Sequence, residues 1–366
     1  MRSFPRRRES SSFWVPACAG TTSTIPVKAL VIAPSWIGDT IMAQPLFARL
    51  HARHRGLQLD ALAPRWVAPV LQRMDEISEV IDSPFGHGQI GLKPRWRLAR
   101  ELAARGYDAV YVLPNSLKSA LIPFLAGIPQ RVGFTGESRY GLINRRHHLD
   151  KQALPLMVER FAQLAEPPGA ALTRPVAFPR LRSTRKNGEN ALSALGIGQP
   201  EKMVAFCPGA EYGPAKRWPA AHFAELARHL AADGYAIWLF GSPKDHAVAE
   251  DIAQAAPGLC RNLCGATSLD QAVDLLALAD LVVCNDSGLM HVAAALERPI
   301  VALYGSSSPG FTPPLSDRAD ILSLNLDCSP CFKRECPLGH LDCLNKLSPA
   351  QVLAACRQRI ACGIVP

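Results

Sequence analysis

One short stretch of this chain combines residue types that could hold a phosphorylated ligand. Residues 285–288 interrupt the apolar run 281–284, and a segment with helical spacing follows, carrying His291 one helical turn after Ser287. A strand that turns directly into a helix presents free backbone N–H groups and the positive end of the helix dipole, which favour a phosphate or carboxylate. From this stretch alone, an ordinary strand–helix unit in which Asp286 caps the helix remains an alternative.

Two further turns in the same half of the chain carry suitable polar groups. Residues 208–216 and 241–245 each follow an apolar run, as residues 285–288 do. In a parallel α/β domain all three turns leave the same edge of the sheet, where ligands bind. Lys216 is a mobile cation that suits a diphosphate, although a surface charge is its alternative role. Glycines would let the backbone approach a ligand closely, and acidic side chains suit sugar or ribose hydroxyls: Gly209, Gly241 and Gly288, with Glu211 and Asp286.

In the first half, Asp39 is the candidate for acid–base chemistry. It lies in the turn 34–40, directly after the apolar run 27–33. A carboxylate at the carboxyl end of a strand can accept a proton from an incoming hydroxyl. Its alternative role is to cap the helix that follows, which Pro45 requires either to begin late or to be kinked.

These groups must be positioned by alternating strands and helices. Apolar runs of strand length recur along the chain, and helical spacing fills several of the intervals between them: 27–33, 57–61, 79–82, 108–113, 203–207, 235–240, 281–284 and 300–304. This alternation predicts βαβ units and parallel sheets. Because the two halves repeat one plan, we predict an α/β protein of two Rossmann-like domains that face each other across a cleft. The Pro-, Gly- and Arg-rich segment between the halves predicts a linker.

Composition narrows the possible partners. The 366 residues are 48% hydrophobic and 19% charged, with a formal net charge of +9. The charge favours an anionic partner, but nucleic-acid-binding signatures are missing, so we expect no nucleic acid. No run of about 18 or more apolar residues predicts a membrane span. Residues 1–26 resemble neither a signal peptide nor a domain, so we expect a disordered, non-native extension.

Residues 86–91 match the dinucleotide-binding pattern G-x-G-x-x-G. The pattern needs a strand directly before it and a helix that begins within it. Pro84 interrupts the preceding run and Pro94 follows, so we predict a flexible loop. An NAD-dependent oxidoreductase remains an alternative from another class of enzyme.

A cysteine-rich segment lies near the end of the chain. Cys328, Cys331, Cys336 and Cys343, with His340, are spaced somewhat like metal ligands, but the separations differ from those of common zinc ribbons. The eleven cysteines are an odd number. We therefore expect reduced thiols of a cytoplasmic protein and a structural loop with no metal, while zinc remains open.

The chain resembles the ADP-heptose:lipopolysaccharide heptosyltransferases of glycosyltransferase family nine, and among them those that add the second heptose. The resemblance runs from about residue 27 into residues 312–315. It is carried by residues 33–39, 113–120, 139–142, 155–160, 207–219 and 285–296. It implies a GT-B fold, with an acceptor domain at 27–178, a linker at 179–198 and an ADP-heptose domain at 199–348. It also implies a last helix within 349–366 that packs back on the first domain.

The resemblance also implies an inverting transfer of L-glycero-D-manno-heptose from ADP-heptose to the first heptose of the inner core, heptosyl-Kdo2-lipid A. We expect Asp39 as the base and Lys216 as the group that stabilises departing ADP, with no cofactor required. The donor contacts expected are Gly209, Glu211, Lys216, Gly241, Asp286, Ser287, Gly288 and His291. The acceptor contacts expected are Asn115, Ser116, Lys118, Arg131 and Arg139.

The anionic lipid A-core acceptor and the basic surplus lead us to expect peripheral contact with the cytoplasmic face of the inner membrane. We expect a monomer. Two alternatives stay open beside the oxidoreductase. One is a heptosyltransferase I or another family member with a different acceptor, and the other is a non-catalytic protein that binds nucleotide sugars.

Overall fold

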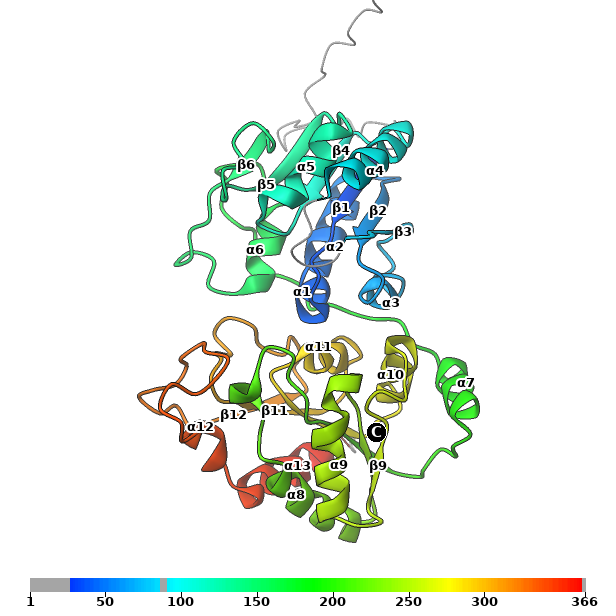
Figure 1. Ribbon diagram of the computed structural model, residues 1–366, viewed down its shortest axis with the longest axis vertical. Coiled ribbons are helices and arrows are strands. Elements are labelled where there is room, and N and C mark those ends of the chain that lie inside the picture. Colours follow the sequence, from blue (N-terminus) through cyan, green and yellow to red (C-terminus); the bar gives the residue numbers. More distant parts are fainter. Residues whose placement is uncertain (1–26, 86–90, 364–366) are drawn as a thin grey trace, which may run out of the picture.

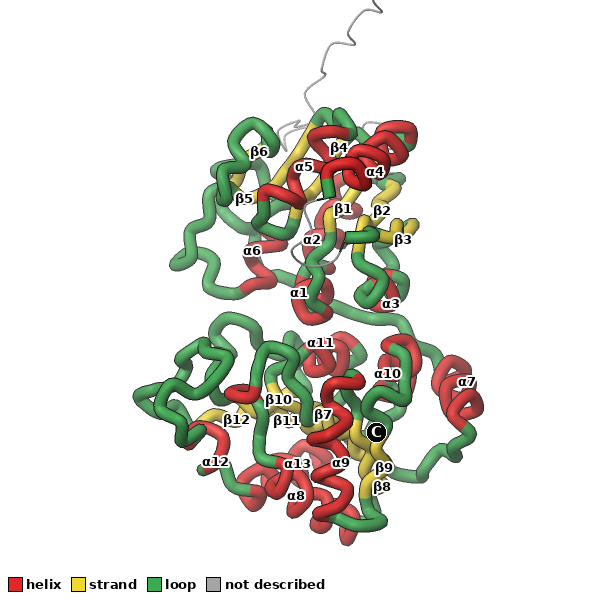
Figure 2. Tube along the Cα trace, in the orientation of Figure 1, coloured by secondary structure: helices red, strands yellow, loops and turns green. Residues whose placement is uncertain are grey.

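The computed structural model describes residues 27–85 and 91–363. Residues 1–26, for which we expected a disordered extension, lie outside the described residues. So does most of the G-x-G-x-x-G segment, for which we expected a flexible loop. Figure 1 shows two domains stacked along the long axis, and in Figure 2 the strands of each domain lie inside its helices.

The first domain is a 6-stranded parallel sheet with the order β3-β2-β1-β4-β5-β6. Its strands are β1 (Lys28–Ile32), β2 (Gln58–Ala63), β3 (Glu79–Asp82), β4 (Ala109–Val112), β5 (Gln130–Phe134) and β6 (Arg145–His147). Its helices are α1 (Ile37–Met42), α2 (Gln44–Arg53), α3 (Ala68–Leu71), α4 (Leu92–Ala104), α5 (Leu117–Leu125) and α6 (Met157–Gln163). The helix expected around Pro45 is divided at Ala43, and the proline occupies the first turn of α2, where its missing N–H costs no intrahelical bond.

The second domain repeats this plan with the strand order β12-β11-β10-β7-β8-β9, again all parallel. Its strands are β7 (Met203–Cys207), β8 (Ala236–Leu239), β9 (Cys260–Asn262), β10 (Leu281–Asn285), β11 (Ile300–Tyr304) and β12 (Ala319–Ser323). Its helical segments are α7 (Arg185–Leu195), η1 (Pro214–Lys216), α8 (Ala220–Ala232), η2 (Pro243–Asp245), α9 (His246–Ala255), α10 (Leu269–Leu276), α11 (Gly288–Ala295), α12 (Asp342–Asn345) and α13 (Pro349–Gly363).

The central strands form because their residues are apolar on both faces of the sheet. All five residues of β7, β10 and β11 are buried, which is the pattern of a parallel strand covered by helices on both sides. In the first domain, one buried cluster lies between the sheet and α4 and α5. In the second domain, another lies between the sheet and α8, α9 and α13.

The two domains share their largest apolar cluster. It extends from the first sheet through α1 and α2 to α10 and α11 of the second domain, and includes Ile41 and Val292. Helix α1 packs against α11, and α3 against α10, which Figure 1 shows where the domains meet. The Arg73 guanidinium crosses the same boundary to Asp274, with 2.7 Å between nitrogen and oxygen. The helices that follow the carboxyl ends of strands in both sheets therefore pack against each other.

The segment 179–198, expected as a linker, contains α7, which packs on α10 and buries Ala191 and Leu192. One expectation about the chain's connections is corrected, because the last helix does not pack back on the first domain. Helix α13 packs on α8, β10, β11 and β12, with Val352 and Cys356 buried there.

Candidate active site between the domains

Asp39 lies in the first turn of α1, at the edge of the domain interface. Trp36 occupies the N-cap position of the helix and Asp39 lies within it, so the expectation that Asp39 is the N-cap is wrong. No described residue donates a hydrogen bond to this carboxylate. Burial raises the pKa of Asp39 to about 6; the ammonium of Lys216 opposes the rise in pKa and the carboxylate of Asp286 adds to it. The carboxylate therefore interacts electrostatically with two groups of the other domain.

A close helix crossing brings Asp39 to this position. An added Cβ at Gly38 would lie 2.6 Å from Cδ2 of His291, and one at Gly288 would lie 3.0 Å from Cβ of Ile37. In each helix, a glycine therefore leaves room for a side chain of the other helix. Burial lowers the pKa of His291 to about 4, with Asp286 opposing this shift, so the imidazole is neutral at pH 7.

Lys216 and Asp286 form an ion pair opposite Asp39. Lys216 ends η1, which follows β7, and its Nζ lies 2.5 Å from Oδ2 of Asp286. The ring of Tyr212 lies below the same ammonium, 5.1 Å away, which adds a cation–π contact. Both partners of the pair are mostly buried. The cation is therefore held in a fixed place by groups on two turns of one sheet edge.

The turn after β10 has the features of an anion site. Asn285 fixes it from inside, because its amide accepts a hydrogen bond from Trp218 N and donates one to the carbonyl of Pro208. Ser287 is the N-cap of α11, and its buried hydroxyl has no hydrogen-bond partner among the described residues. A buried hydroxyl without a partner beside the N-terminus of a helix can serve an incoming phosphate.

Two further polar residues of this sheet edge were not predicted as site residues from the sequence. Ser306 and Ser307 follow β11, the neighbour of β10, and both hydroxyls are buried without a partner within the described ranges. The Gly-Ser-Ser-Ser turn after a buried strand was the available signal, since small hydroxyl residues at a strand's carboxyl end are suited to ligand contacts.

The remaining predicted donor residues surround Asp245. An added Cβ at Gly209 would lie 2.3 Å from Cγ of Asp245, and one at Gly241 would lie 2.8 Å from its Cβ. These glycines make room for a carboxylate that accepts hydrogen bonds from the backbone and hydroxyl of Ser242. Glu211 is exposed and pairs with Lys244. Donor contacts by Gly209, Gly241 and Glu211 stay predictions.

Four of the predicted acceptor residues follow β4 or β5 at the carboxyl edge of the first sheet, whereas Arg131 is the second residue of β5 and lies at the opposite, amino end of that strand. Ser116 caps α5, and the buried Arg139 donates to the carbonyl of Pro114 and to Asn115. Arg131 donates to backbone carbonyls at 2.6 Å. Both arginines therefore brace loops, and contact with an acceptor stays a prediction for them, as for the partly exposed Lys118. Strand β4 pairs with β1, so this edge continues to the turn that carries Asp39.

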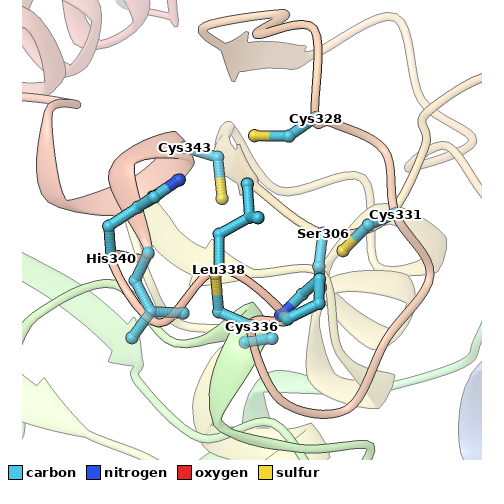
Figure 3. Close-up of a pocket in the computed structure, with 10 residues that line it drawn as sticks. Ser306, Cys328, Cys331, Cys336, Leu338, His340 and Cys343 are labelled. Carbon is cyan, nitrogen blue, oxygen red and sulfur yellow. The ribbon is translucent and has the colours of Figure 1, made fainter.

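The cysteine-rich segment lines a small pocket together with Ala215, which precedes Lys216, and with Ser306 (Figure 3). Burial raises the pKa of Cys343, and the neighbouring thiols raise it further. Backbone N–H groups lower the pKa of Cys336. Within residues 27–85 and 91–363, no three His, Cys, Asp or Glu side chains stand in a geometry that would hold a metal ion. The pocket contains four free cysteines and one imidazole: Cys328, Cys331, Cys336, Cys343 and His340.

Comparison with known proteins decides the family. A sequence profile described as glycosyltransferase family 9 (heptosyltransferase) matches residues 95–342. Lipopolysaccharide heptosyltransferase 2 of Escherichia coli (strain K12) is 47% identical over 336 residues, which cover 89% of this chain and 97% of that protein. The chain belongs to glycosyltransferase family 9. The family expected from the sequence is confirmed.

The fold agrees with this assignment. The solved structure of E. coli ADP-heptose LPS heptosyltransferase II matches with a TM-score of 0.83 and 44% identity, covering 92% of this chain and 99% of that one. Lipopolysaccharide heptosyltransferase 1 of Pseudomonas aeruginosa is 24% identical over 85% of this chain. This family member therefore has the GT-B arrangement expected from its sequence and is a glycosyltransferase of the heptosyltransferase type.

Proposed function

We propose that this enzyme transfers L-glycero-D-manno-heptose from ADP-heptose to the first heptose of the lipopolysaccharide inner core. The choice of acceptor is supported by 47% identity to a lipopolysaccharide heptosyltransferase 2 over 89% of the chain. The observation that carries the proposed chemistry is the position of the Asp39 carboxylate within electrostatic reach of Lys216 and Asp286, across the domain interface.

The reaction proceeds by one displacement with inversion. The acceptor hydroxyl oxygen bonds to the anomeric carbon, its proton passes to the Asp39 carboxylate, and the bond from the anomeric carbon to the diphosphate oxygen breaks. With a pKa of about 6, Asp39 is about nine-tenths ionised at pH 7 and remains basic enough to take the proton. No enzyme nucleophile is needed, because the acceptor itself attacks.

Departing ADP carries the bonding electron pair and a growing negative charge. Lys216 and the free N–H groups at the start of α11 meet that charge, with the hydroxyl of Ser287 beside them. Groups that are already in place need no reorganisation during the reaction. The step is therefore proposed to need no metal ion or other cofactor, and an excess of chelator should leave the rate unchanged.

The site belongs to one chain, since α1 and α11 of the same molecule meet at it. The enzyme is accordingly proposed to act as a monomer at the cytoplasmic face of the inner membrane, where the lipid-linked acceptor is found. Among the described residues, no helix is long and apolar enough to cross a bilayer. We propose that contact with the membrane is peripheral.

The test is transfer from ADP-heptose to defined truncated cores that carry either no heptose or one heptose, with the linkage of the product determined. The proposal expects product only from the acceptor with one heptose. Product only from the heptose-free core would assign the activity of a heptosyltransferase 1. Failure with both acceptors would reject this substrate assignment.

A further inference from the structure

Helix α5 exposes apolar side chains on its outer side. Leu117, Phe124 and Leu125 are 45%, 43% and 41% exposed, and Leu121 is partly exposed. These positions are separated by four, three and one residues, so they form a single stripe along the helix. The opposite side, with Ala120 and Ile122, is buried against the sheet. The helix is thus apolar on both sides, although one of them faces solvent.

Helix α4 packs beside α5 (Figure 1) and carries a large exposed aromatic side chain. Trp96 is 55% exposed, and the guanidinium of Arg100 lies 5.0 Å from the centre of its ring. The guanidinium of Arg131 lies 5.4 Å from the ring of Phe124 in the same way. Aromatic rings paired with basic groups are typical of side chains at a membrane–water interface.

The exposed charges of α4 and α5 have predominantly one sign, although the Glu137 carboxylate accepts a hydrogen bond from Leu117 N at the start of the stripe. The exposed or partly exposed charged residues of α4 and α5 are four basic residues and one acidic residue: Lys93, Arg97, Arg100, Lys118 and Glu101. A second copy of the chain placed face to face would bring equal basic groups together, which disfavours a dimer through this face. An anionic bilayer offers both negative headgroups and an apolar interior.

The place of the stripe in the fold fits a lipid-linked substrate. Helix α5 begins at Leu117, directly after the turn at the carboxyl end of β4, and β4 pairs with β1, which leads to Asp39. The stripe therefore starts at the rim of the proposed site. A sugar acceptor could enter the cleft from that rim while its acyl chains stayed in the membrane.

We propose that the outer face of α4 and α5 docks on an anionic lipid bilayer, with the apolar stripe of α5 at the boundary between headgroups and acyl chains. The docking proposal rests on the proposed function in one respect only, namely that the acceptor is linked to a lipid. Binding to the bilayer itself requires neither donor nor acceptor, so it can be measured separately from transfer.

The experiment is flotation of the full chain with vesicles of phosphatidylethanolamine and phosphatidylglycerol, compared with vesicles of phosphatidylcholine alone. The test variant is Phe124→Gln with Leu125→Gln, and its matched control is Leu259→Gln, at a residue of the second domain that is 39% exposed. We expect wild type and control to bind the anionic vesicles and the test variant to bind at least about tenfold more weakly. Arg97→Gln with Arg100→Gln, at exposed charges, should weaken binding in the same direction and does not depend on the packing of α5.

Transfer to a delipidated, water-soluble acceptor separates this inference from the proposed function. All variants should keep the wild-type rate with that acceptor. The docking proposal is overturned by wild type that does not float with anionic vesicles, or by variants that float as wild type does. If sedimentation shows that wild type is a dimer and that the α5 variant is a monomer, the docking proposal is overturned, because a second copy of the chain then covers this surface. A wild type that binds vesicles but transfers to no acceptor would count against the proposed function and leave the docking surface standing.

Discussion

Gly38→Ala is expected to slow transfer by about 100-fold while leaving the protein folded. Gly38 is the second residue of α1 and directly precedes Asp39. A methyl group at this position would lie 2.6 Å from Cδ2 and 3.2 Å from Nε2 of His291. The imidazole is buried in α11 and has little room to move. The first turn of α1 must therefore shift away from the second domain.

The size of the shift sets the size of the effect. Carbon atoms pack favourably at about 3.5–4.0 Å, so the contact is too short by about 1 Å. A misplacement of about 1 Å can cost about 100-fold in rate, because the base no longer meets the reacting hydroxyl. The free energy of unfolding should fall by no more than about 2 kcal/mol, because overpacking costs about 1–3 kcal/mol and replacing a helical glycine with alanine returns about 1 kcal/mol.

The assay is kcat/KM for transfer, together with the free energy of unfolding in urea. Gly198→Ala is the matched control, because its Cβ would meet nothing within 4 Å. In a second step, Gly38→Ala is combined with His291→Ala, which removes the clash. The double variant should then be little slower than His291→Ala alone. A Gly38→Ala enzyme within about threefold of wild type would refute the claim that this helix crossing positions Asp39.

Four further outcomes follow from the site. Because Asp39 must be ionised to act and its pKa is raised to about 6, kcat/KM should rise with pH and reach half its plateau near pH 6; a flat profile from pH 5 to 8 would contradict this. Because burial raises the pKa of Asp39 from 3.8 to about 6, the ionised carboxylate destabilises the fold increasingly as the pH rises through this range. Asp39→Asn should therefore raise the free energy of unfolding by up to about 3 kcal/mol at pH 8 and leave it unchanged at pH 3, which urea titrations at both pH values would show. Lys216→Ala should weaken ADP-heptose binding at least about tenfold by calorimetry, whereas Lys244→Ala should not. Among the thiols, alkylation followed by mass spectrometry should find Cys336 modified before Cys343, since backbone N–H groups lower the pKa of one and burial raises that of the other.

Most strands, and the carboxyl edge of each sheet as the place of the site, could be predicted because they depend on local patterns. Fully apolar runs such as β7, β10 and β11 have one stable use in an α/β protein, which is the centre of a parallel sheet. The strands that were missed, β5, β6, β9 and β12, have no fully buried run. Strands β6 and β9 are three residues long and polar, and β6, β9 and β12 lie at sheet edges, where a strand has only one partner.

Other features depend on contacts between distant parts of the chain. Helix α7 begins with Arg185 and Lys186, which resemble a polar linker, and its two buried apolar residues gain stability only against α10. The sequence of α13 predicts a helix but does not say which domain receives it. The contact between Gly38 and His291 requires the relative placement of both domains, so only the shared sheet edge could be expected in advance.

The central claim is that Asp39 removes the proton from the acceptor and does nothing essential for the donor. Asp39→Asn keeps the size of the side chain and removes its basicity, so its kcat and its affinity for ADP-heptose can be compared directly with wild type. We predict a loss of about 100-fold or more in kcat with a dissociation constant for ADP-heptose within about threefold of wild type. An Asp39→Asn enzyme that turns over at the wild-type rate, or one that loses donor affinity and rate in equal measure, would contradict the claim.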